Sequence, residues 1–72
     1  MDESRRRQIR SEIVDLEATI RGHRGEIANR RAMLAHEKSG SSQARGHEND
    51  IRGLESSIRA NEQKINQLKR AL

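Results

Sequence analysis

The stretch Ser39-Gly40-Ser41-Ser42 separates two long segments that share one hydrophobic pattern. In residues 9–34 and again in residues 51–72, aliphatic side chains recur at steps of three and four. This spacing places them on one side of a helix, as in the seam of a coiled coil. The two series are out of register by three residues across the interruption, which one straight coiled coil accommodates poorly. The chain is therefore predicted to reverse direction here.

Folding the chain back between Gly40 and Ser41 places residue i opposite residue 81 − i. The aliphatic residues then face each other, and three oppositely charged pairs flank the seam: Glu17 with Lys69, Arg24 with Glu62, and Arg31 with Glu55. We predict an all-α fold, an antiparallel two-helix coiled-coil hairpin in a single domain, residues 1–72. The first helix is expected over residues 3–38, the turn over 39–42 and the second helix over 43–72. Continuous antiparallel helices from two chains satisfy the same pairing, but the break favours a turn within one chain.

The apolar content of the chain is small, and its concentration on one seam predicts association. Of 72 residues, 31% are hydrophobic and 36% are charged. A lone pair of helices with so little apolar surface is marginally stable. We therefore expect a homodimer, in which two hairpins form a four-helix bundle. Polar residues within the seam, namely His23, Arg30 and Asn61, are expected to fix the register. His23 and Asn61 lie in adjacent layers, where they could hydrogen-bond across the seam.

The overall composition predicts a soluble cytoplasmic protein without a membrane partner. The chain has no cysteine for a disulfide framework and no apolar run that suits a signal peptide or a membrane span. Its net charge of +4 favours an acidic partner. The chain contains no Phe, Trp or Tyr, so it lacks the side chains on which nucleic-acid bases usually stack.

The sequence favours neither an enzyme nor a cofactor-binding protein. A narrow two-helix seam offers no water-shielded pocket for acid–base or nucleophilic groups, and no glycine-rich phosphate loop is present. Two histidines and two carboxylates gather near the turn, and such groups can bind zinc. Their spacing matches no zinc signature, so we predict a solvated helix end without a metal: His36, Glu37, His47 and Glu48.

Two outward faces are the candidate binding sites. On the second helix, the positions away from the seam carry no acid, and arginines recur there every seventh residue. This basic stripe, predicted to bind an acidic protein or nucleic acid, consists of Arg45, Arg52, Arg59 and Arg70. On the first helix, the side opposite the seam is predicted to admit a partner helix. We call this the small face, and it consists of Ala18, Gly22, Gly25, Ala28 and Ala32.

These patterns support two functions. The first is a small non-catalytic homodimeric protein–protein interaction module, an adaptor or inhibitor that docks a helix face on a protein partner. The second is a nucleic-acid-binding protein that uses the basic stripe. In its hairpin and expected four-helix bundle, the chain is similar in shape to the plasmid-copy-control Rop proteins. That resemblance implies RNA binding as the alternative function, although a shared shape does not by itself carry a function.

Overall fold

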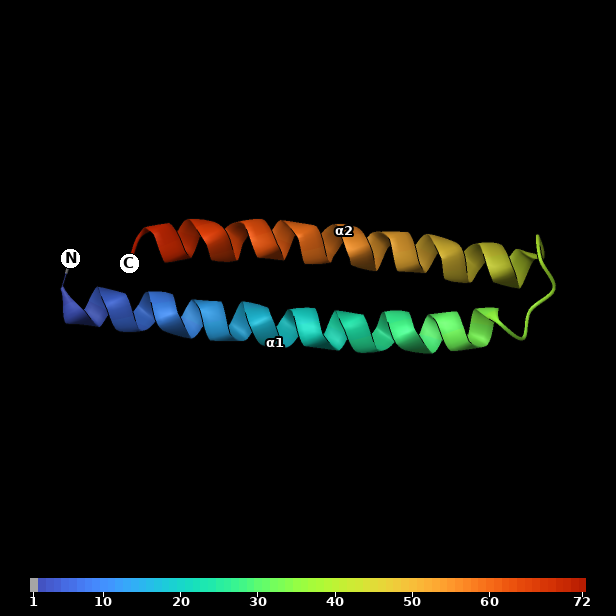
Figure 1. Cartoon of the computed structure of the whole chain (residues 1–72), viewed down its shortest axis with the longest axis horizontal. Coiled ribbons are helices and arrows are strands. Elements are labelled where there is room, and N and C mark those ends of the chain that lie inside the picture. Colours follow the sequence, from blue (N-terminus) through green and yellow to red (C-terminus); the bar gives the residue numbers. More distant parts are fainter. Residues whose placement is uncertain (1) are drawn as a thin grey trace.

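The computed structural model describes residues 2–72 as two antiparallel helices joined by a short connection (Figure 1). The first helix, α1, spans Glu3–Leu34, and the second, α2, spans Ser42–Arg70. They pack side by side into a rod with Cα extents of 55 × 15 × 11 Å. The N- and C-termini lie at the same end of the rod (Figure 1). The predicted two-helix hairpin is confirmed.

Each helix begins at a side chain that satisfies its first backbone N–H groups. The Asp2 carboxylate accepts a hydrogen bond from the Arg5 backbone N–H at 2.7 Å. The Ser41 hydroxyl accepts one from the Ala44 backbone N–H at 3.1 Å. Both residues have extended backbone angles and act as N-caps, which stabilise a helix start by about 1 kcal/mol.

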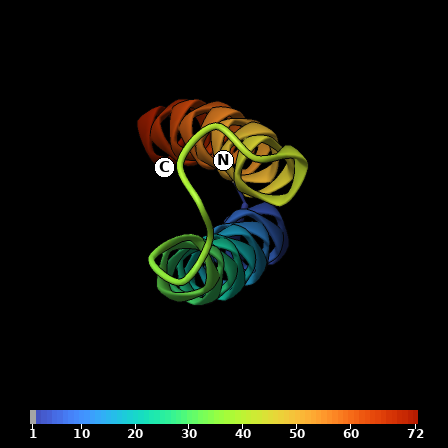
Figure 2. The same ribbon diagram turned by 90° about the vertical axis from the view of Figure 1, so that its right-hand side faces the viewer.

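The connection between the helices is longer than predicted. α1 ends at Leu34 rather than at Lys38, and α2 begins at Ser42 and ends at Arg70. After Leu34 the next seam position is the polar Glu37, so continuing the helix buries no further aliphatic side chain. The chain instead makes tight turns, with the Glu37 N–H bonded to the Leu34 carbonyl. Figure 2 shows the connection crossing from α1 to α2, and Gly40 permits this at a positive φ of 78°.

The core is the aliphatic seam that the spacing predicts. Both helices contribute isoleucines to a continuous buried cluster, and Leu16 and Leu54 pack against it while remaining partly exposed. The buried members of this cluster are Ile9, Ile13, Ile20, Ile27, Ile51, Ile58, Ile65 and Leu68. Near the turn, the small side chain of Ala44 is also buried. Burial of these side chains is the main source of stability available to a two-helix fold.

Ion pairs across the hairpin confirm the predicted alignment of the two helices. Arg24 pairs with Glu62 at 3.6 Å, and Arg31 pairs with Glu55 at 3.5 Å. The third predicted pair, Glu17 with Lys69, is not among the ion pairs of residues 2–72. All of these side chains are well exposed, so each pair adds only a few tenths of a kcal/mol. The main effect of these ion pairs is to select this register and the antiparallel orientation of the helices.

Candidate interaction surfaces

The turn half of the seam holds a polar cluster that links the two helices. The Arg30 guanidinium lies 3.2 Å from an Asp50 carboxylate oxygen and 3.4 Å from Nδ1 of His47. Arg30 and His47 are half-buried at seam positions, whereas Asp50 lies at the exposed edge. The hydrogen bond that the alignment would allow between His23 and Asn61 is not among those of residues 2–72, although both side chains are half-buried. The polar link across the seam is therefore made by Arg30.

The small face of α1 is open. Its five residues, Ala18, Gly22, Gly25, Ala28 and Ala32, are all exposed. A Cβ atom built at Gly22 or at Gly25 has no neighbour within 4 Å among the described residues. The structure thus places these residues together on the outside of the hairpin, where the hairpin itself leaves room for larger side chains.

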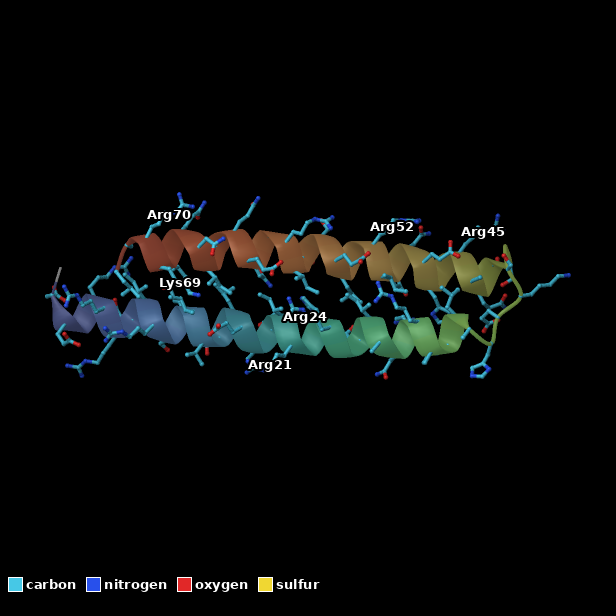
Figure 3. The ribbon with its side chains drawn as sticks, viewed as in Figure 1. Arg21, Arg24, Arg45, Arg52, Lys69 and Arg70 are labelled. Carbon is cyan, nitrogen blue, oxygen red and sulfur yellow. The ribbon has the colours of Figure 1, made fainter. Side chains whose placement is uncertain are left out.

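The basic stripe lies along the outside of α2. Arg45, Arg52, Arg59 and Arg70 are all exposed, and Figure 3 shows Arg45, Arg52 and Arg70 along the outer edge of the helix. The Arg52 guanidinium donates a hydrogen bond to the Asn49 side-chain oxygen, and the Arg70 Nε donates to the Asn66 carbonyl at 3.4 Å. Arg70 falls outside the seven-residue repeat, whose next member after Arg59 is Asn66. The first three arginines therefore form the regular part of the stripe.

A groove between the helices brings together cations from both helices, a grouping that the sequence interpretation did not identify. It consists of two adjoining hollows of about 480 and 460 Å³, which share Arg24. Figure 3 shows Arg24 and Lys69 on the inner side of the hairpin. The charged residues that line this groove are Arg21, Arg24, Arg31, Arg59 and Lys69, together with Glu17, Glu55 and Glu62. The signal was present in the sequence, because these residues flank the seam on one side at helical spacing.

The opposite side of the hairpin has a different charge. A hollow of about 460 Å³ there is lined by Glu26, Arg30 and Asp50 among its charged residues. Carboxylates outnumber cations on this side, whereas cations outnumber carboxylates in the groove that contains Arg24. The net charge of +4 is therefore unevenly distributed around the rod.

The histidines and carboxylates near the turn, His36, Glu37, His47 and Glu48, were considered as possible metal ligands from the sequence. Within residues 2–72, no three His, Asp or Glu side chains are arranged so that they could hold a metal ion. His47, one of the residues considered for this role, contacts Arg30 instead. In the same part of the chain, neither helix combines the length and apolar character that crossing a membrane requires.

Comparisons with protein-family models, with curated proteins and with solved structures find no match for this chain. What bears on the function of this chain is therefore the geometry and chemistry of its own surfaces. Two features stand out: the open small face of α1, and the arginines that repeat along α2.

Proposed function

We propose that this chain is a small non-catalytic homodimeric module for protein–protein interaction, an adaptor or inhibitor of a protein partner. The observation that supports this most directly is the pair of glycines in the middle of α1. Each helical glycine costs up to about 1 kcal/mol relative to alanine. Packing inside the hairpin does not account for Gly22 or Gly25, because a Cβ atom at either position meets nothing within 4 Å among the described residues. Glycine at such a position suits close approach of another backbone from outside.

The order of residues in the small face favours a second copy of the chain as the occupant. The spacings from Ala18 through Gly22, Gly25 and Ala28 to Ala32 are four, three, three and four residues, which is symmetric about Gly25. An antiparallel contact between two α1 helices, centred on Gly25, places Ala18 opposite Ala32 and Gly22 opposite Ala28. A two-fold interface requires such self-complementarity, since the same patch serves both subunits.

This contact defines how the four helices of the dimer are arranged. The small face lies opposite the seam, so the helices stand in a row, α2–α1–α1–α2, rather than around one shared core. The large hydrophobic side chains that remain exposed are Val14, Met33 and Leu72. Val14 and Leu72 lie toward the terminal end and Met33 toward the turn, so they do not form one apolar seam. The row leaves both α2 helices free to contact a partner.

Sedimentation equilibrium of Gly25→Leu tests the dimer. Leucine favours the helix by nearly 1 kcal/mol over glycine, so the hairpin gains stability while close approach is blocked. We expect the dimer dissociation constant to rise at least about tenfold. Gly53→Leu on α2 is the matched control, because Gly53 is also helical with nothing within 4 Å of its Cβ among the described residues. Equal self-association of the two variants contradicts the proposed interface, as does a wild-type protein that is monomeric at high concentration.

Nucleic-acid binding is the second candidate function, and the exposed arginines of α2 favour it. Three phosphate contacts by Arg45, Arg52 and Arg59 predict a slope of about −2 to −3 for log affinity against log salt. Replacing all three by glutamine keeps helix propensity, removes the charge and flattens that slope. Titrations of mixed-sequence RNA and DNA between about 50 and 300 mM salt measure this effect. Affinity that is absent, or equal in the wild type and the triple variant, excludes the arginines as a nucleic-acid site.

A further inference from the structure

The outer surface of α2 has two parallel rows of residues that repeat together. Each arginine of the row Arg45, Arg52 and Arg59 is followed by a small residue, and these form a second row of Gly46, Gly53 and Ala60. Two helical turns separate successive members, so each row repeats about every 10 Å. All six residues are exposed, and a Cβ atom at either glycine has nothing within 4 Å among the described residues. The outer face of α2 thus has arginines along one edge and small residues, the smooth strip, along the other, with Asn49, Ser56 and Gln63 between them.

The positive charge of the arginine row is left uncompensated by the hairpin. The carboxylates three or four residues from the arginines, where helical ion pairs form readily, are Glu48, Glu55 and Glu62. Glu55 and Glu62 instead pair across the hairpin with Arg31 and Arg24. Among the ion pairs of residues 2–72, none involves the three arginines of the row. The arginines of α1 therefore occupy two of these three carboxylates, whereas Glu48 is in none of the ion pairs of residues 2–72.

We propose that this face of α2 binds an acidic α-helix of a protein partner, which lies along the rod. Carboxylates at every seventh residue of the partner repeat about every 10 Å and match the arginine row. The planar guanidinium groups hold such carboxylates through paired hydrogen bonds. The row of Gly46, Gly53 and Ala60 lets the partner backbone come close enough for this contact. The inference rests on the proposed function, because it names the partner of an interaction module.

The arrangement fits an acidic helix better than a nucleic-acid strand. Glu55 and Glu62 line the groove next to the arginine row, at positions where a continuous line of phosphates is repelled. Carboxylates spaced by seven residues meet the arginines and avoid these acids. The chain also has no aromatic side chain on which single-stranded bases stack. The repeat distance, the flanking acids and the smooth strip all correspond to a helical partner.

Fluorescence anisotropy with synthetic helical peptides tests this site. The probe is an alanine-rich helix with glutamate at every seventh position, and the control peptide has the same composition in scrambled order. We expect the ordered peptide to bind at least about fivefold more tightly than the scrambled one. Changing Arg45, Arg52 and Arg59 together to glutamine removes three exposed charge pairs and weakens binding about tenfold. Circular dichroism confirms that this variant remains helical.

Two glycine variants separate this site from the dimer interface. Gly53→Leu blocks the smooth strip and is expected to weaken peptide binding about tenfold, while Gly22→Leu on α1 leaves the affinity per hairpin unchanged. If the protein is a monomer yet binds the ordered peptide, the homodimer fails while the α2 site stands. Equal binding of ordered and scrambled peptides, or wild-type affinity in Gly53→Leu, overturns the acidic-helix site. Tighter binding of RNA or DNA than of the ordered peptide overturns it in favour of a phosphate ligand.

Discussion

The two ends of the seam are held together by different chemistry. Toward the termini, the facing positions are aliphatic in both helices, with Ile13 opposite Leu68 and Leu16 opposite Ile65. Toward the turn, Ile27 still faces Leu54, but beyond that pair Ile51 faces Arg30 and Leu34 faces His47. The Arg30 guanidinium contacts both His47 and Asp50. The terminal half therefore depends on burial, whereas the turn half combines weaker burial with polar contacts and a covalent connection. The covalent turn already holds the two helices together in that half. The turn half of the seam therefore needs less hydrophobic contact.

The largest expected effect comes from alanine substitutions at two equally buried isoleucines, one in each half of the seam. Ile65 and Ile51 are both 7% exposed on the same helix, but Ile65 faces Leu16 while Ile51 faces Arg30. We expect Ile65→Ala to lower the free energy of unfolding by about 3–4 kcal/mol and Ile51→Ala by about 2 kcal/mol. The cost is smaller at Ile51 because the flexible arginine stem can move into the vacated space. Urea denaturation at one fixed protein concentration gives both values.

Equal losses at the two positions would show that the halves of the seam are energetically alike. A larger loss at Ile51 would reverse the comparison and identify the turn half as the stable part of the hairpin. Ile58→Ala, at a position 8% exposed near the middle of the rod, should fall between the two variants.

Replacing the polar contact in the turn half by apolar side chains should make the two halves alike. The double variant Arg30→Leu with His47→Leu removes two half-buried polar groups and extends the aliphatic seam toward the turn. Well-packed hydrophobic residues in place of a partly buried polar contact are often stabilising. We expect a gain of about 1 kcal/mol, or a melting temperature higher by about 4–8 °C. Arg31→Leu, on the exposed edge, is the control and should not stabilise the protein. A loss of stability in the double variant would show that the Arg30 cluster is required.

The sequence predicted the hairpin and the seam because these depend on local or periodic signals. Steps of three and four residues define the buried side of each helix whatever their distance in the chain. Two of three predicted ion pairs followed from the same alignment. The pair of Glu17 and Lys69 has the same spacing, but long exposed side chains have other rotamers and solvent available to them. Alignment alone therefore identifies which pairs are possible, not which of them form.

Two features depended on tertiary structure and were not predicted. Residues 35–38 include good helix formers and no proline or glycine, so nothing local ends α1 at Leu34. The end is set by the need to cross to α2 once the apolar seam stops. The contact of Arg30 with His47 and Asp50 also depends on the rotamer of a long side chain, and the sequence marked Arg30 only as an interruption. On α2, the sequence showed the arginine row, but only the structure showed that Glu55 and Glu62 pair with α1.

The smallest expected effect concerns the ion pairs themselves. Arg30 and Asp50 are 3.2 Å apart, with side chains 39% and 52% exposed. Arg24 and Glu62 are 3.6 Å apart, with side chains 61% and 50% exposed. Because Arg30 is less hydrated, its attraction to Asp50 is less screened by solvent. Double-mutant cycles with alanine should give a coupling free energy of about 0.5–1 kcal/mol for Arg30–Asp50 and about 0.2 kcal/mol for Arg24–Glu62.

Salt provides the check on this interpretation. In 1 M NaCl the screening length falls to about 3 Å, which removes most of the coupling between exposed charges. The coupling of Arg24 with Glu62 should then disappear, while that of Arg30 with Asp50 should keep a measurable part of its value because the Arg30 side chain is shielded within the seam. If both couplings are equal in low salt and vanish together in high salt, burial of Arg30 adds nothing to its attraction for Asp50. The polar contact would then have to be explained by alignment of the helices alone, as for the edge pairs.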